Sequence, residues 1–372
     1  MAVFSAIGLA FLLGIGFLIY FVVDQTRAAP LKVASEDSTE IRIEKIESWL
    51  QSIHESKKEI VNFNGAVLIM KNQKVLMMDT WGYTDVSGTT ELSIQSSLRL
   101  ASVSKQFTAA AILVLASQHK LDLDDRVDLH LKSFPFDDVT IRHLLNMTSG
   151  IPDCYMSLAD THKDTVGDVL SIQEVVQLIG DHPPNRNYDV NEIYQYSNTS
   201  YVLLAGVVEA VSGESFEDFT SKELFEPLGM KNTRVWNLMS STDSFPNKTK
   251  SFMFSDNLEP EFLDGVAGDG AVFSSIEDFV IWERFWREND LVDPELLKQA
   301  FLPVTLKDGI DSDYGFGWVT TEDGAWHNGS WLGARTYVIR DDANELFIVV
   351  LDSSSSQQTD TIAEQIHEAM RQ

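Results

Sequence analysis

Ser102 and Lys105 stand three residues apart in RLASVSKQF (residues 99–107), immediately before a run typical of an apolar helix. Residues i and i+3 lie on the same face of a helix, so this spacing brings the lysine amine within reach of the serine hydroxyl. Serine needs a neighbouring group to take its proton, and backbone N–H groups at a helix start favour a nearby oxyanion. The same spacing recurs at Ser117 and Lys120, and serine is a favoured helix cap. The pair alone therefore indicates either an activated nucleophile or an ordinary capped helix.

Two later stretches carry polar groups suited to the same chemistry. Tyr196-Ser-Asn198 precedes a strongly apolar helix-like run. A tyrosine near a lysine can serve as general acid or base, and an asparagine can orient both a lysine and a substrate amide. His327-Asn-Gly329-Ser330 opens a strand-like region, where glycine allows close approach and a strand edge can donate N–H groups to an acyl oxygen. The alternatives are a packed Tyr196 with Asn198 as a helix cap, and a turn with an exposed His327.

Two similar patterns carry less weight as parts of a site. Lys307-Asp-Gly309 resembles a Lys-Thr-Gly motif in its letters, but the IDSDYG that follows is not a strand edge. Tyr194 precedes Tyr196 by two residues, and we expect it to be structural.

The elements that must position these residues follow from hydrophobic periodicity. It predicts an amphipathic helix over 41–60, a hairpin of 63–70 with 74–81, and a helix after Ser102. Helices are predicted over 140–152, 171–180, 201–213 and 215–229. Strands are predicted over 314–321, 334–341 and 345–352, and a closing helix over 360–372. Strands at both ends of a chain usually join in one sheet. We therefore expect an α/β (α+β) fold: an antiparallel sheet flanked by helices, with an inserted helical lobe and a ligand cleft between the two parts.

Charge and cysteine content exclude several classes of function. The 372 residues include 28 Lys+Arg and 56 Asp+Glu, a net charge of −28, which disfavours nucleic-acid binding. Cys154 is the single cysteine, so no intrachain disulfide forms, and we expect a buried structural thiol. The sequence contains no His-Glu-x-x-His, paired-cysteine or Gly-rich phosphate motif, so we expect neither metal nor cofactor.

Residues 1–23 differ from the rest of the chain. Phe4 to Val23 is an uncharged apolar run of 20 residues. In a helix it would span about 30 Å, the thickness of a bilayer's hydrocarbon core. We expect a single-pass transmembrane anchor, with a cleaved signal peptide as the alternative because TRAAP (26–30) offers small residues for cleavage. A linker over 24–40 and one catalytic domain over 41–372 would follow. We expect that domain to be extracytoplasmic, periplasmic or at the cell surface, and secreted if the segment is cleaved.

Taken together and in order, the motifs resemble the serine beta-lactamase-related family, which includes class C beta-lactamases, D-alanyl-D-alanine carboxypeptidases, D-aminopeptidases and lactamase-fold esterases. The resemblance extends over about residues 60–370 and rests on five segments: 98–127, IRHLLNMTSGIP (141–152), YSNTSYVLLAGVVEAVSG (196–213), LFEPLGM (224–230) and HNGSWLGARTYVIRD (327–341). It implies a penicillin-binding-protein-like fold with Ser102 as the acylated nucleophile and Lys105 as its activating partner. By the same resemblance Tyr196 is the proton shuttle and Asn198 an orienting group. The backbone N–H groups of Ser102 and Ser330 would form the oxyanion hole.

Two departures from the family pattern bear on substrate. Class C beta-lactamases have Lys-Thr-Gly where this chain has His327-Asn-Gly329, and a neutral histidine weakens the hold on a beta-lactam carboxylate. Met147 replaces the histidine of an HTSG segment, which we expect to alter packing only. We therefore expect a membrane-associated serine hydrolase of small-molecule or peptide-like substrates, with peptidase or esterase activity favoured over beta-lactamase. A catalytically inactive binding or scaffolding module is the alternative.

Overall fold

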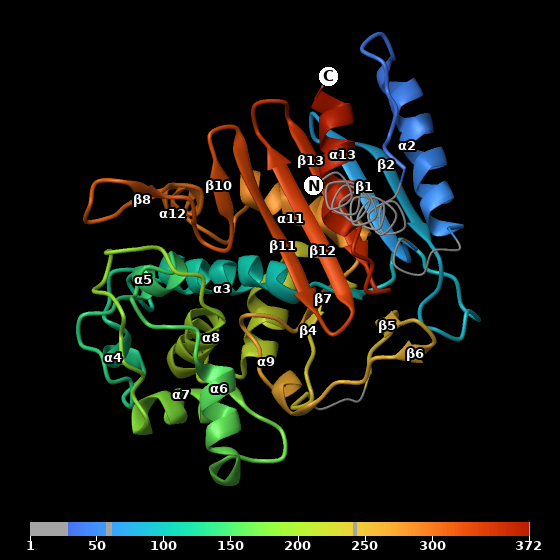
Figure 1. The fold of residues 1–372 in the computed structure, drawn as a ribbon. Coiled ribbons are helices and arrows are strands. Elements are labelled where there is room, and N and C mark those ends of the chain that lie inside the picture. Colours follow the sequence, from blue (N-terminus) through green and yellow to red (C-terminus); the bar gives the residue numbers. More distant parts are fainter. Residues whose placement is uncertain (1–28, 57–61, 241–243, 372) are drawn as a thin grey trace, which may run out of the picture.

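The computed structural model describes residues 29–56, 62–240 and 244–371, and its centre is a six-stranded antiparallel sheet with the order β10-β11-β12-β13-β1-β2 (Figure 1). The strands are β1 (Gly65–Lys71), β2 (Lys74–Trp81), β10 (Val319–Thr321), β11 (Gly324–Trp331), β12 (Ala334–Asp341) and β13 (Leu346–Asp352). The predicted union of the two chain ends is confirmed, because β1 pairs with β13 from Gly65 opposite Asp352 to Lys71 opposite Leu346.

Helices cover both faces of this sheet, because its central strands are apolar on both sides. One face packs against α2 (Thr39–His54) and α13 (Thr359–Arg371), whose stripe of Ile362, Ile366 and Met370 is buried as predicted. The opposite face packs against α11 (Ile276–Arg287) and α3 (Lys105–Ser117). In Figure 1, α3 runs beneath the sheet, between it and the helical lobe.

The middle of the chain forms the predicted helical lobe around α8 (Asn198–Ser212), which contacts α3, α5 and α7. Its other helices are α4 (Val127–His130), α5 (Ile141–Leu145), α6 (Tyr155–Thr161), α7 (Ile172–Asp181), α9 (Phe216–Thr220) and α10 (Glu226–Leu228). α12 (Pro294–Gln299) precedes the hairpin β8 (Val304–Thr305) with β9 (Asp311–Ser312). A small sheet, β3 (Leu98–Arg99), β7 (Val272–Ser274) and β4 (Arg234–Val235), leads into the segment that bears Ser102. β5 (Phe252–Met253) and β6 (Asp256–Asn257) form a further hairpin.

Several predicted boundaries are wrong for local reasons. The helix expected over 41–60 ends at His54, and residues 57–61 lie outside the described part. Only 319–321 of the strand expected over 314–321 is regular. Periodicity does not predict β11 as a separate strand, because glycine, asparagine and serine, all poor strand formers, interrupt its apolar residues. The helix expected over 215–229 is interrupted by a π-helical turn over 221–225.

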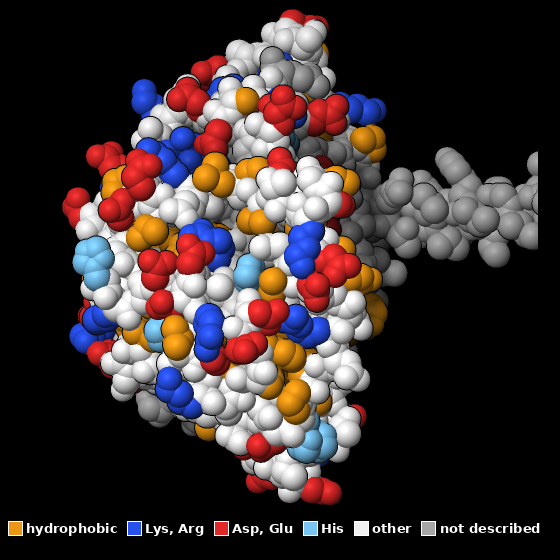
Figure 2. All heavy atoms as spheres, turned by 90° about the vertical axis from the view of Figure 1, so that its left-hand side faces the viewer, with side chains coloured by type: hydrophobic (Ala, Val, Ile, Leu, Met, Phe, Trp, Pro, Cys, Tyr) orange, Lys and Arg blue, Asp and Glu red, His pale blue; other side chains and the backbone are white. Residues whose placement is uncertain are grey.

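The surface of the described chain carries charges of both signs despite the net charge of −28. Figure 2 shows acidic and basic side chains interspersed on the face that carries α4, α5 and the β8–β9 hairpin. No helix within the described ranges is long and apolar enough to cross a membrane. The predicted anchor, residues 1–23, lies outside those ranges.

Candidate active site

Ser102 lies in the first turn of a short 3-10 helix (Ala101–Ser104) that continues directly into α3. The residue before it, Ala101, has a φ of +48°, a backbone conformation that residues other than glycine rarely adopt. Such strain clusters at active sites, where the surrounding fold must maintain it. Ser102 lines a cavity of about 270 Å³ between the sheet and the helical lobe. The expected cleft and the position of Ser102 in it therefore coincide.

Lys105 is fully buried one helical turn after Ser102. Its Nζ donates to Ser102 Oγ at 3.2 Å, to Asn198 Oδ1 at 2.8 Å and to the backbone oxygen of Asp269 at 2.9 Å. An ammonium has three donors, and these three acceptors fix its position next to the hydroxyl. The i, i+3 geometry expected from the sequence is present, whereas the rival pair Ser117–Lys120 lies at the far end of α3.

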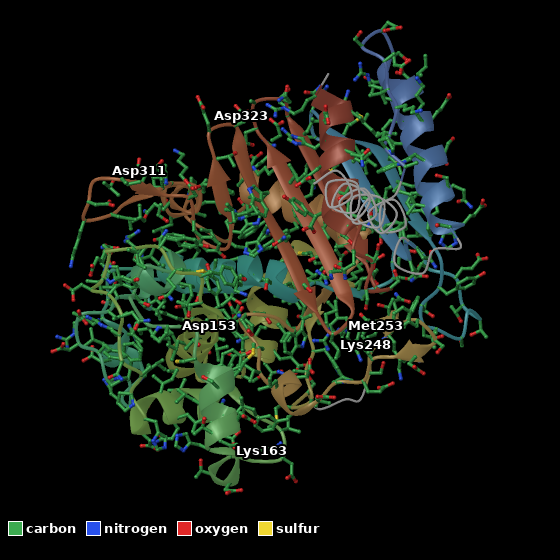
Figure 3. The ribbon with its side chains drawn as sticks, viewed as in Figure 1. Asp153, Lys163, Lys248, Met253, Asp311 and Asp323 are labelled. Atoms are coloured by element: carbon green, nitrogen blue, oxygen red, sulfur yellow. The ribbon has the colours of Figure 1, made fainter. Side chains whose placement is uncertain are left out.

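Asn198 is the first residue of α8, and its amide is oriented by a carboxylate. Its Nδ2 donates to Asp153 Oδ2 at 2.8 Å, so its Oδ1 faces Lys105. The other oxygen of Asp153 accepts from the backbone N–H and the hydroxyl of Thr199, both at 3.0 Å. The helix cap is Ser197, not Asn198. Asp153 lies in the helical part below α3 (Figure 3). Its role was not found from the sequence because 45 residues separate it from Asn198.

Tyr196 lies beside Lys105, with its ring centroid 5.0 Å from the ammonium and 37% of its surface exposed. It is therefore partly exposed beside Lys105 rather than packed into the core. Tyr194 instead stacks on buried Tyr314, with 5.5 Å between ring centroids, which agrees with a structural role. Met147 supports the loop that carries Tyr194 and Tyr196. Its sulfur accepts a hydrogen bond from the backbone N–H of Ser197, and its backbone oxygen accepts one from the backbone N–H of Gln195.

β11 passes close to Ser102 because Gly329 has no side chain. A Cβ at this position would be 2.8 Å from the backbone nitrogen of Ser102 and 2.5 Å from the backbone oxygen of Leu100. β10 pairs only with residues 324–326, so residues 327–331 have no strand partner on that side. Ser330 lines the cavity together with Ser102. The expected open strand edge beside the serine is present.

His327 lies on β11 and is buried, with 2% of its surface exposed, so the alternative of an exposed turn histidine is wrong. Its Nε2 hydrogen-bonds to the hydroxyl of Tyr314 at 2.9 Å, and its Nδ1 to the backbone oxygen of Asn328 at 2.6 Å. Burial, and secondarily the nearby Lys105 charge, lower the pKa of His327 to about 3. The ring is therefore neutral at physiological pH and supplies no fixed cation.

The cavity is also lined by a group of charged and polar residues that the sequence did not reveal. Arg99 Nη1 donates to Asp264 Oδ1 at 3.0 Å, and the indole of Trp331 donates to the same oxygen at 2.9 Å. Asp269 Oδ2 accepts from the hydroxyl of Tyr155 at 3.0 Å. All five side chains line the cavity. They come from four separate segments, so no local pattern marks them as a group.

The arrangement suits acyl transfer. A hydroxyl, a lysine amine and a tyrosine lie together, a backbone edge is open beside the hydroxyl, and a cavity can receive the acyl group. Lys307 of the rival Lys-Asp-Gly stretch lies in the β8–β9 connection, where it forms an exposed ion pair with Asp189. Within the described ranges, no group of three or more His, Cys, Asp or Glu residues could hold a metal ion.

Comparison with known proteins gives one consistent result. The model of the Beta-lactamase family matches residues 58–370. Penicillin-binding protein 4* of Bacillus subtilis is 36% identical over 312 residues, which cover 78% of this chain and 68% of that protein. A D-aminopeptidase of Brucella anthropi is 28% identical, covering 73% of this chain but only 52% of the relative. Among solved structures, FmtA from Staphylococcus aureus superimposes with a TM-score of 0.72 at 20% identity, covering 95% of each chain.

Proposed function

Because the chain belongs to the beta-lactamase family of serine hydrolases, we propose that it cleaves an amide, peptide or ester bond through an acyl-enzyme on Ser102. The observation that carries this proposal is the contact of Lys105 Nζ with Ser102 Oγ, held by Asn198 and by the Asp269 backbone. Lys105 in its neutral form takes the Ser102 proton as Oγ attacks the acyl carbon. Tyr196 passes that proton to the leaving amine or alcohol as the bond between it and the acyl carbon breaks. The backbone N–H groups of Ser102 and Ser330 receive the oxyanion. Water activated through Tyr196 then releases the acyl group.

Covalent labelling tests this proposal directly. A fluorophosphonate probe should modify the wild-type protein at Ser102, identified by mass spectrometry of the labelled peptide. Ser102→Ala should not label, whereas Ser104→Ala should, because Ser104 Oγ only accepts from the backbone N–H of Val272. Equal labelling of wild type and Ser102→Ala would remove Ser102 as the nucleophile. A saturable ligand without adduct or turnover would favour the alternative, a binding or scaffolding module.

Peptidase or amidase activity and esterase activity rank ahead of beta-lactamase activity in this proposal. Neutral His327 occupies the position of the lysine in class C beta-lactamases, which removes a fixed cation that would hold a substrate carboxylate. The names of the relatives, a penicillin-binding protein and D-aminopeptidases, support the same ranking. Hydrolysis of a chromogenic cephalosporin as fast as a simple ester would reverse it.

We also propose that residues 1–23 attach the enzyme to a membrane, with the catalytic domain on the extracytoplasmic side. The support is the uncharged run of 20 apolar residues from Phe4 to Val23. The full chain should sediment with membranes and resist extraction by carbonate, and a chain without residues 1–28 should not. Recovery of the full chain in the soluble fraction, with its N-terminus intact, would contradict attachment.

A further inference from the structure

The cavity beside Ser102 is lined by more acidic than basic side chains. Among the described residues that line it, the charged side chains are Arg99, Asp264 and Asp269. Arg99 and Asp264 form an ion pair, with side chains 6% and 2% exposed. Asp264 also accepts from Trp331 and, through Oδ2, from the backbone N–H of Glu261. This pair is neutral overall and well supplied with hydrogen bonds. Asp269 is the remaining acidic group; burial raises its pKa, and the nearby Lys105 charge acts in the opposite direction.

The Asp269 carboxylate has hydrogen-bond capacity left over. It accepts from the hydroxyl of Tyr155 and from its own backbone N–H. A carboxylate offers about four acceptor positions, and Asp269 lines the cavity, so this carboxylate has acceptor capacity to spare for a group bound there. Lys105 lies near enough to influence it, but all three donors of that ammonium are directed to Ser102, Asn198 and the Asp269 backbone oxygen. No ion pair to Asp269 occurs within the part of the chain that the structure describes.

Asp269 is also held at a short distance from the reacting group. Its backbone oxygen and Ser102 Oγ contact the same Nζ, so its side chain belongs to the immediate surroundings of the nucleophile. The preceding residue, Gly268, has a φ of +106°, and a Cβ there would be 2.3 Å from the backbone oxygen of Tyr201. The chain must therefore turn at Gly268, and this turn directs the backbone oxygen of Asp269 to Lys105 and its carboxylate to Tyr155.

From this geometry we infer that Asp269 is a specificity-determining residue that binds a protonated amine carried by the substrate close to the scissile carbonyl. A carboxylate in a confined cavity attracts a cation strongly, and an ammonium supplies donors for the acceptor positions that Tyr155 leaves open. The inference rests on the proposed acyl transfer at Ser102 and adds the class of substrate. Amides or esters of α-amino acids with a free amino group satisfy it.

A matched pair of substrates tests the inference. Alanine p-nitroanilide and lactic acid p-nitroanilide, each tested as both enantiomers, differ only in an ammonium against a hydroxyl. We expect wild type to prefer the amine in kcat/KM by about 10- to 100-fold, the range for a charge-assisted hydrogen bond. Asp269→Asn should reduce this ratio to near one, and Asp269→Glu, which keeps the charge, should retain part of it. Asp160→Asn, an exposed carboxylate of the helical lobe, should leave the ratio unchanged.

The outcomes separate this inference from the proposed function. Fluorophosphonate labelling at Ser102 together with a wild-type ratio near one would overturn the role of Asp269 and leave the acyl-enzyme in place. A ratio unchanged in Asp269→Asn would overturn it equally, as would labelling without cleavage of either anilide. Absence of both labelling and cleavage would overturn the proposed function and this inference together. The wild-type ratio alone decides the matter if Asp269→Asn fails to fold.

Discussion

At the scale of single residues, the site depends on how each polar side chain is held. Lys105 is fixed by three acceptors, and one of them, Asn198, is itself oriented by Asp153. An asparagine side chain can rotate to exchange its oxygen and nitrogen, and only one orientation presents an acceptor to Lys105. Asp153 is therefore a positioning residue that acts through Asn198.

Removing the two proposed proton carriers should slow turnover without unfolding the protein. Lys105→Ala and Tyr196→Phe should each lower kcat by about 10²- to 10⁴-fold, the range for general acid–base groups. Tyr194→Phe is the matched control, because Tyr194 stacks on Tyr314, and its kcat should be close to that of wild type. Steady-state kinetics on a simple ester check this. Wild-type rates in Lys105→Ala or Tyr196→Phe would exclude that residue from proton transfer.

Removing the carboxylate of Asp153 should free the Asn198 amide. We expect Asp153→Ala to lower kcat by about 10-fold while KM changes little. Of the three hydrogen bonds that it removes, the one from Asn198 orients the amide, and such a bond is worth about 1–2 kcal/mol. Asn198→Asp should also lower kcat, because a carboxylate in place of the amide cannot donate to Asp153. If Asp153→Ala changes KM alone, the carboxylate contacts substrate rather than positioning Asn198.

At the scale of elements, the site exists because β11 and the 3-10 helix come together. Thr336 of β12 donates its hydroxyl to the backbone oxygen of Leu100, and Gly329 of β11 leaves room for the backbone of Ser102. The strand β11 and the 3-10 helix over 101–104, far apart in the sequence, therefore lie against each other at Ser102.

A side chain at position 329 should separate these two elements. Gly329→Ala places a Cβ 2.5 Å from the Leu100 oxygen and 2.8 Å from the Ser102 nitrogen, both backbone atoms that cannot rotate away. We expect a loss of about 1–3 kcal/mol in the free energy of unfolding, typical of overpacking, and a large loss of kcat. Urea denaturation measures the first. Gly270→Ala, with no atom within 4 Å of its Cβ, should keep the stability of wild type. Equal stability of both variants would show that β11 moves freely.

At the scale of the whole molecule, burial of a neutral histidine makes stability depend on pH. Burial lowers the pKa of His327 to about 3, whereas the unfolded chain has a value near 6.5. Below pH 6.5 the unfolded chain takes up a proton that the folded protein excludes. The contribution is thus fully present above pH 6.5 and is lost as the pH falls toward 3.

The loss of this contribution should amount to about 2 kcal/mol at pH 5, from 1.36 kcal/mol per pH unit below 6.5. His327→Gln, which carries no charge at any pH, should flatten the fall in the free energy of unfolding between pH 7 and pH 5. His119→Asn, at an exposed position, should not. Chemical denaturation at several pH values compares the slopes. An unchanged slope in His327→Gln would show that another group causes the acid sensitivity.

The sequence by itself determined the nature of the chemistry and most of the fold. Period-2 and period-3.6 patterns are local properties, so the first hairpin, the helical middle and the closing helix were predictable, and Ser102 with Lys105 lies within one turn. Only the tertiary structure decided which distant side chains complete the site. Long-range packing brings four residues to the site: Asp153, Tyr155, Asp264 and Asp269. The burial and neutrality of His327 likewise depend on its contact with Tyr314 and on its place in β11. Side-chain environment is a property of the folded chain, and so is the set of charged groups that lines the cavity.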